Sequence, residues 1–289
     1  MKIEIEPGVR LYVDVEGMGL VPDGAAMREK PTLVLLHGGP GADHTGWKPR
    51  VSTLTDLAQI IYFDHRGHGR SDRRPAHEWT LDCWADDVVR LCTALGIEHP
   101  IVWGQSFGGM VAQRYLARHP AHPAKVILSS CSPHLGLARK LAAFERLGGE
   151  RARKVAEAYW SNPSPEWLPE FLEVCLPLYN PTPQPDTAGA RAHFDTVLLN
   201  AWNRTELPGL NLLPGLARAV CPVLVLGGEE DPVTPISDQR DIAAALPKDC
   251  VEFHAVAGAG HGIWRDKPEE ALALVRHFIA APHQVKTKP

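Results

Sequence analysis

The feature of this chain that most constrains its fold is a repeated alternation between short apolar runs and longer amphipathic stretches. The apolar runs are continuous and bounded by Gly, Pro or Asp, as expected of strands that are buried on both faces of a sheet. Such runs occur at 33–36, 60–63, 101–103, 126–128 and 223–226, and a further strand is expected at 251–256. Alternation of strands with helices is typical of βαβ units, and it predicts an α/β fold with a mostly parallel sheet between helices.

Helical periodicity marks the segments that should cover this sheet. Their apolar residues recur every three to four positions, and they span 81–95, 108–118, 238–246 and 269–279. In the first of them Trp84, Val88, Leu91 and Leu95 share one stripe. The start of the chain differs, because the pattern of residues 3–5 and 9–15 indicates an antiparallel hairpin.

The alternation stops in the middle of the chain. Residues 133–215 contain helical patterns joined by proline-rich segments, which predicts a helical cap over one end of the sheet that shapes a substrate pocket. The expected domains are the first part of the core at 1–132, the cap at 133–215 and the second part of the core at 216–289. The large apolar residues of the cap are expected in its core rather than in the pocket wall: Trp160, Trp167, Leu198 and Trp202.

A candidate nucleophile lies in Gly104-Gln105-Ser106-Phe107-Gly108, between an expected strand and an expected helix. Glycines two positions before and after a serine are typical of a sharp strand-to-helix turn, where a Cβ would crowd the backbone. The turn exposes the hydroxyl and places a helix N-terminus beneath it. A bare G-x-S-x-G also occurs as a glycine-rich turn with a capping serine, so the prediction that Ser106 is the nucleophile depends on the flanking strand and helix.

A second glycine-rich loop, His37-Gly38-Gly39-Pro40-Gly41, follows the strand expected at 33–36. Its glycines allow backbone angles that let main-chain amides approach a ligand closely. We predict that the N–H groups of Gly39 and Phe107 form an oxyanion hole, since Pro40 has no N–H to donate. His37 is interpreted as a structural residue that hydrogen-bonds the backbone of this loop.

A serine nucleophile needs a histidine base and a carboxylate that orients the base. In a sheet of this kind both follow the serine, on loops after later strands, with the acid first. Asp231 and His261 occupy such loops after the last two expected strands. Asp231 is preferred over Glu229 and Glu230 because the Asp-Pro-x-Thr-Pro turn would hold it most rigidly. The predicted catalytic residues are therefore Ser106, Asp231 and His261.

The loop at 64–71 is rich in charged and turn-forming residues. We interpret it as structural, with Asp64 and Arg66 holding neighbouring backbone by charge-assisted hydrogen bonds. The histidines of this loop, taken with Asp43 and His44, match no spacing of metal ligands, and the six scattered cysteines form no C-x-x-C pair. No metal site and no cofactor are predicted.

Charge and hydropathy narrow the class of partner. The formal net charge is −4 with acids and bases interspersed, which argues against a nucleic acid partner. The first residues have no apolar signal region, and no apolar run approaches the length needed to span a membrane. We therefore expect a cytoplasmic protein that acts on a small acyl substrate without a membrane partner, while the oligomeric state stays open.

With these motifs assembled, the chain resembles the α/β-hydrolase superfamily over nearly its full length. The loop 37–41 and the segment Asp64-x-Arg66-Gly67-x-Gly69-x-Ser71 resemble the proline iminopeptidase branch in particular. The resemblance implies an eight-stranded, mostly parallel sheet with a helical cap, and no metal or organic cofactor. Peptidases of that branch hold the amino terminus of the substrate with acidic residues, typically in the cap and near the catalytic acid. Here the residue after Asp231 is Pro232, which cannot bind an amino terminus. This difference favours esters or lactones as substrates.

Three functions follow as hypotheses. The first is a serine hydrolase that cleaves a small carboxylic ester or lactone through an acyl-enzyme on Ser106. The second is a proline iminopeptidase-like aminopeptidase that releases an N-terminal residue, for which the cap offers several acids: Glu145, Glu150, Glu157, Glu166, Glu170, Glu173 and Glu206. The third is a non-catalytic ligand-binding protein, since a fold does not by itself determine a function.

Overall fold

The computed structural model of the protein describes residues 1–182 and 188–282, and its centre is an eight-stranded sheet with the order β1-β2-β6-β5-β7-β8-β9-β10. The β1–β2 and β2–β6 pairs are antiparallel, and the other pairs are parallel. The predicted mostly parallel α/β sheet of eight strands is therefore confirmed. Its strands are β1 (Lys2–Glu6), β2 (Val9–Glu16), β5 (Thr32–Leu36), β6 (Gln59–Phe63), β7 (Ile101–Gln105), β8 (Lys125–Ser129), β9 (Val223–Gly228) and β10 (Val251–Val256).

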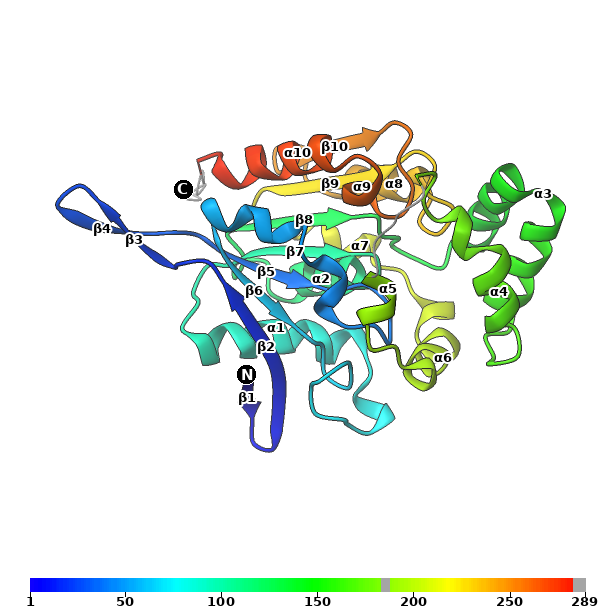
Figure 1. Ribbon diagram of the computed structural model, residues 1–289, viewed down its shortest axis with the longest axis horizontal. Helices are drawn as coiled ribbons and strands as arrows, with labels where there is room; N and C mark the ends of the chain where they lie inside the picture. Colours follow the sequence, from blue (N-terminus) through cyan, green and yellow to red (C-terminus); the bar gives the residue numbers. More distant parts are fainter. Residues whose placement is uncertain (183–187, 283–289) are drawn as a thin grey trace.

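Helices cover both faces of this sheet (Figure 1), and alternate residues of β5 belong to two different buried clusters. Leu33 and Leu35 belong to a buried cluster with residues of the 3-10 helices η1 (His44–Trp47) and η2 (Val51–Asp56) and of the helices α9 (Ile263–Asp266) and α10 (Pro268–Ala280). Val34 and Leu36 belong to another, with residues of α1 (Leu81–Leu95), α2 (Phe107–Arg118), α7 (Leu213–Leu216) and α8 (Ile236–Ala245). Burial on both faces explains why the central strands β5 to β9 are mostly apolar runs in the sequence.

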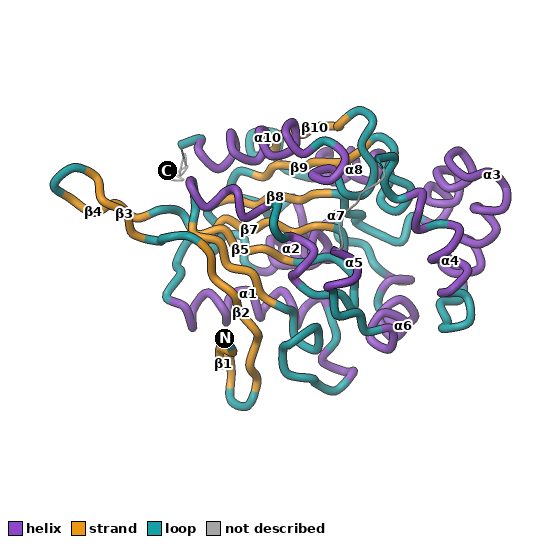
Figure 2. Tube along the Cα trace, in the orientation of Figure 1, coloured by secondary structure: helices purple, strands orange, loops and turns teal. Residues whose placement is uncertain are grey.

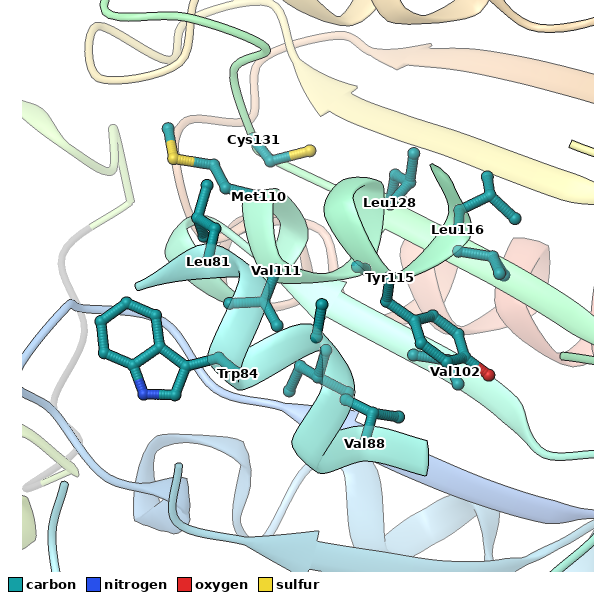
Figure 3. Close-up of a cluster of buried hydrophobic side chains, with 14 of the residues drawn as sticks. Leu81, Trp84, Val88, Val102, Met110, Val111, Tyr115, Leu116, Leu128 and Cys131 are labelled. Atoms are coloured by element: carbon teal, nitrogen blue, oxygen red, sulfur yellow. The ribbon is translucent and has the colours of Figure 1, made fainter. Parts of the chain in front are cut away.

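The pair formed by α1 and α2 anchors the part of the sheet that carries Ser106. Trp84 and Val88 of α1 lie against Val111 and Tyr115 of α2 in one buried cluster (Figure 3). The Thr80 side chain accepts the N–H of Cys83 at the start of α1, and Gly96 ends the helix in the left-handed conformation. The helix predicted at 81–95 has those bounds in the structure.

Between β8 and β9 the described chain is helical. It contains α3 (Leu137–Ser161), α4 (Leu168–Val174), α5 (Ala188–Arg191), α6 (Thr196–Thr205) and α7, with the short 3-10 helices η4 (Leu176–Leu178) and η5 (Leu207–Gly209). Figure 1 shows α3 and α4 together at one end of the molecule, beyond the carboxyl ends of the parallel strands. They share a small core that includes Phe144, Tyr159 and Phe171. The cap limits of 133 and 215 stay a prediction, and residues 183–187 of that segment lie outside the described chain.

Two features near the N-terminal half were not anticipated. Strands β3 (Leu20–Asp23) and β4 (Ala26–Glu29) form a separate two-stranded hairpin, which projects from the body of the molecule (Figure 2). These strands carry almost no buried residue, so the sequence has no alternation of apolar and polar positions to mark them. Another 3-10 helix, η3 (Ala76–Glu78), precedes α1. In the described chain, no helix combines the length and the apolar character needed to cross a membrane.

Candidate active site

The strand order itself indicates where a ligand would bind. The order reverses at β5, which has β6 on one side and β7 on the other, and open α/β sheets bind ligands beyond the carboxyl ends of the strands at such a point. A cavity of about 490 Å³ lies there, and Gly39, Ser106, Phe107 and His261 are all in its wall. The loops that contain the predicted site residues therefore meet at one cavity.

Ser106 occupies the sharp turn that its glycine neighbours predict. Its φ is 55° and its ψ is −119°, a backbone conformation that costs about 1–3 kcal/mol in a non-glycine residue and persists only where its surroundings impose it. A β-carbon on Gly104 would overlap the carbonyl group of Gly108, and a β-carbon on Gly108 would overlap that of Leu36. The close passage of α2 over β7 and β5 therefore requires both glycines.

The structure brings the three predicted side chains together in hydrogen-bonding order. Ser106 Oγ lies 2.9 Å from Nε2 of His261, and Nδ1 of His261 lies 2.8 Å from Oδ2 of Asp231. Because the carboxylate can only accept, Nδ1 carries the proton in this pair, and Nε2 is left to accept the proton of the serine hydroxyl. These residues come from the loops after β7, β9 and β10.

Asp231 is held by more bonds than the one to the histidine. Its Oδ1 accepts the N–H groups of Val233 at 2.7 Å and Thr234 at 2.9 Å, and its Oδ2 also accepts the Thr234 hydroxyl at 2.6 Å. The residue is 1% exposed. Of its rivals in the sequence, Glu229 is exposed and Glu230 forms an ion pair with Arg146. The turn therefore orients one carboxylate toward His261.

Residues of the cap segment hold the histidine loop, and the sequence analysis missed them. The N–H of His261 donates to the carbonyl of Tyr179 at 2.6 Å, and the Tyr179 ring stands edge-on to the imidazole with 5.4 Å between ring centroids. The N–H of Gly262 donates to Oδ1 of Asn180 at 2.8 Å. A proline-rich connection has no periodic pattern, so no sequence signal was available for these contacts.

The two residues predicted to form the oxyanion hole line the same cavity as Ser106. Phe107 is the first residue of α2, so its N–H has no acceptor in a preceding helical turn, and it lies at the positive end of the helix dipole. Gly39 has a φ of 128°, which a residue with a side chain rarely adopts. Both residues line the cavity. The arrangement can therefore present two backbone N–H groups to a charged oxygen near Ser106.

The structural roles expected of His37 and Asp64 agree with their contacts in the structure, but the role expected of Arg66 does not. Nε2 of His37 accepts the N–H of His65 at 3.0 Å, in agreement with its interpretation as a structural histidine. Asp64 accepts the N–H groups of His44 and Arg70, also as expected. The expectation for Arg66 was wrong, because its guanidinium binds side chains instead of backbone. Its carboxylate partners are Glu6, Glu78 and Asp87.

Three buried histidines in and near the loop 37–41 couple the stability of the protein to pH. Burial lowers the pKa of His65 well below 6.5 and that of His68 to about 3, and burial lowers the pKa of His37 as well. Neither ring nitrogen of His65 has a partner in the described structure. As the pH falls below 6.5, the unfolded chain takes up these protons first, so the free energy of unfolding must decrease.

Replacement of His65 with phenylalanine should therefore flatten the pH dependence of stability. The ring already lies edge-on to Phe63 and Phe107, so an apolar ring suits the position. Between pH 7 and pH 5 the wild type should lose about 2 kcal/mol more of its unfolding free energy than His65→Phe, measured by urea denaturation. Equal losses would contradict the neutral buried imidazole, and exposed His77 replaced by phenylalanine serves as control.

Some large residues of the cap segment were assigned to the wrong surroundings. Trp160 packs against the cap core, as expected, and it also lines the cavity. Trp202 lines the cavity and belongs to the cluster over the sheet, and Trp167 is 37% exposed, although both were expected in the cap core. Leu198 is fully buried, as expected, but it belongs to the cluster over the sheet. Helical periodicity identifies the buried face of a helix but does not distinguish a cavity wall from a core.

Among the described residues, one group of side chains has its potential ligand atoms close enough together in space to bind a metal ion. It consists of His134, Asp238 and Asp241, outside the cavity wall. Arg139 already lies 2.8 Å from the Asp238 carboxylate and 2.5 Å from that of Asp241, and the Ser132 hydroxyl donates to Asp238. The positive charge that these carboxylates require comes from the guanidinium, so the group does not indicate a metal centre.

Comparisons with known proteins agree with this architecture. A model of the alpha/beta hydrolase fold family matches residues 31–268. The chain is 28% identical to a protein of Caulobacter sp. (strain K31) that carries the provisional name carbamate hydrolase RutD, covering 92% of this chain and 97% of that one. It is 28% identical to the bifunctional esterase/perhydrolase DCH of Acinetobacter calcoaceticus, covering 86% and 93%. The crystal structure of a proline iminopeptidase from Mycobacterium smegmatis has a TM-score of 0.74 at 24% identity, covering 96% and 97%.

Proposed function

The chain belongs to the alpha/beta hydrolase fold family, and from this membership and the geometry of the cavity we propose a serine hydrolase that cleaves a small carboxylic ester or lactone. The observation that carries the proposal is the hydrogen-bonded series from Ser106 through His261 to Asp231, at a cavity that Gly39 and Phe107 also line. A hydroxyl is a poor nucleophile until an oriented base removes its proton, and this arrangement supplies both base and orientation.

The proposed reaction has two halves. In the first, Ser106 Oγ attacks the acyl carbon while its proton passes to Nε2 of His261, and the N–H groups of Gly39 and Phe107 stabilise the charged oxygen. The imidazolium returns the proton to the leaving alcohol oxygen, which departs and leaves an acyl-enzyme. In the second half a water molecule loses its proton to His261, attacks the ester on Ser106, and the carboxylic acid product leaves as the serine regains its proton. Asp231 stabilises the imidazolium in both halves.

Charge in the cavity supports esters or lactones over N-terminal peptides. An aminopeptidase must bind the positive amino terminus of its substrate, yet none of the cap glutamates that could do so lies in the cavity wall formed by the described residues. Asp43 does lie in the wall, but it is already bound by Thr45 and by the guanidinium of Arg70. Lys140, a cation, lies there as well. A substrate ammonium would therefore meet like charge.

A proline iminopeptidase-like activity is the second candidate. The loop 37–41 resembles that of the proline iminopeptidase branch, and the fold of the chain resembles a solved iminopeptidase structure. To distinguish the ester or lactone hydrolase from the aminopeptidase, the wild type is assayed with short p-nitrophenyl esters, small lactones and aminoacyl arylamides. We expect the esters or lactones to be hydrolysed fastest, since amides have a poorer leaving group. Dominant hydrolysis of the proline arylamide would reverse the ranking. A fluorophosphonate probe that fails to label Ser106 would instead favour the non-catalytic binding protein.

A further inference from the structure

Lys140 is a charged residue in the cavity wall that the proposed reaction does not use. It belongs to α3 and is only 2% exposed. Its ammonium donates a hydrogen bond to the carbonyl of Val233 and lies 5.2 Å from the ring centroid of Trp160. Among residues 1–182 and 188–282, no carboxylate forms an ion pair with it. A lysine at this position is thus held by one carbonyl and an aromatic face.

A buried ammonium in such surroundings lacks a counter-ion and part of its hydrogen-bond acceptors. It has three N–H donors, of which the carbonyl of Val233 takes one, and a buried charge is costly unless a counter-ion and hydrogen bonds compensate for the lost water. Burial accordingly lowers the pKa of Lys140, while the charges of Asp238 and Asp231 act in the opposite direction. A carboxylate that enters the cavity would supply both the counter-ion and the missing acceptors.

The rest of the cavity agrees with an anionic ligand that has an aliphatic body. Its wall is rich in aliphatic and aromatic side chains from the cap segment, among them Leu168, Phe171, Leu172, Leu176, Phe194 and Leu199. The carboxylate of Asp43 is engaged by Arg70, so it does not neutralise Lys140. Because Ser106 and Lys140 line the same cavity, one molecule can present its acyl carbon to the first and a second polar group to the other.

We propose that Lys140 binds a carboxylate of the substrate, so that the preferred substrate is an ester or lactone that carries a second carboxylate, remote from the acyl carbon. This inference rests on the proposed function and names its substrate class. Lys140 would then determine specificity, since a neutral substrate of equal length leaves its remaining donors unpaired.

The test compares two p-nitrophenyl esters of equal chain length, the mono-ester of adipic acid and the ester of hexanoic acid. For the wild type, kcat/KM should be about 10- to 100-fold higher for the adipate ester, the effect expected of a hydrogen bond to a charged group. Lys140→Met should abolish that preference, and Lys140→Arg should keep part of it. Lys154→Met is the matched control, because Lys154 also belongs to α3, beyond its kink at Gly149, but is exposed and paired with Glu150.

The ratio of the two kcat/KM values separates substrate binding from a structural role. If Lys140 only supported the turn through the carbonyl of Val233, Lys140→Met would slow both esters equally and leave the ratio unchanged. That result would overturn the proposal, as would a wild type that prefers the hexanoate ester.

A binding measurement distinguishes failure of this inference from failure of the proposed function. Monomethyl adipate and methyl hexanoate are titrated by calorimetry into Ser106→Ala and into the double variant with Lys140→Met. Tighter binding of monomethyl adipate, by about 10-fold or more and lost in the double variant, supports the carboxylate site even if neither nitrophenyl ester is hydrolysed. Equal binding of the two ligands overturns it, even if Ser106 proves to be the nucleophile.

Discussion

Replacement of Ser106 with alanine should lower kcat for the best ester by about six orders of magnitude, the loss found when the nucleophile of a triad is removed. Without Oγ no acyl-enzyme can form, and only direct attack by water beside the N–H groups of Gly39 and Phe107 remains. The residual rate should be measured with purified variant at high enzyme concentration. A fluorophosphonate probe, which labels an activated serine, should give no adduct with the variant.

The chain offers a closely matched control for this substitution. Ser130 is the other non-glycine residue with a positive φ in the described structure, at 44°, and it is fully buried. Ser130→Ala therefore removes a hydroxyl from another residue with a positive φ, outside the cavity wall. Its kcat should stay within about threefold of the wild type, as for a substitution with little effect on the site. If Ser106→Ala hydrolysed esters as well as Ser130→Ala does, the acyl-enzyme proposal would be lost.

Replacement of Asp231 with asparagine should lower kcat by about four orders of magnitude with little change in structure. Oδ1 accepts two backbone N–H groups, from Val233 and Thr234, so the amide oxygen of asparagine would take that position. Its NH₂ group would then face Nδ1 of His261. Nδ1 would have to accept, the proton would move to Nε2, and Nε2 could no longer accept the proton of Ser106.

The neighbouring glutamates test whether the acid has been identified correctly. Glu230 lies one position before Asp231 but forms an ion pair with Arg146 instead of with the histidine. Glu230→Gln should therefore keep kcat within about threefold of the wild type, the small effect expected of an exposed ion pair. The rate of fluorophosphonate labelling of Ser106 should fall in Asp231→Asn and not in Glu230→Gln. If the labelling rate instead fell in Glu230→Gln and not in Asp231→Asn, Glu230 would be the acid.

Much of the fold was predictable because it depends on local patterns. A strand buried on both faces must be apolar at every position, and a helix on a sheet must repeat its apolar residues every three to four positions. The first rule located β5, β6, β7, β8 and β9, and the second located the helices α1, α2, α8 and α10. The pattern of an antiparallel hairpin located β1 and β2, and the run at 251–256 located β10. The hairpin of β3 and β4 was missed because its residues are exposed, so burial left no pattern in them.

The candidate site was predictable to the level of its loops, for a similar reason. Gly104 and Gly108 are required by backbone contacts within one strand-to-helix turn, so they mark that turn in the sequence. The turn after β9 likewise selects Asp231 through bonds to residues two and three positions away. Each of these signals is local, and each identifies a residue without specifying its distant partner.

The sequence by itself determined the strands of the main sheet and the principal helices beside it, the turn that carries Ser106 and the loops of Asp231 and His261. Only the tertiary structure decided that Ser106 and His261, 155 positions apart, lie within hydrogen-bonding distance. It also decided that Tyr179 holds the histidine loop, that Arg66 binds carboxylates and that Lys140 is buried in the cavity wall. The physical reason is that contacts between elements depend on how whole helices pack, whereas periodicity records only which face of each element is buried.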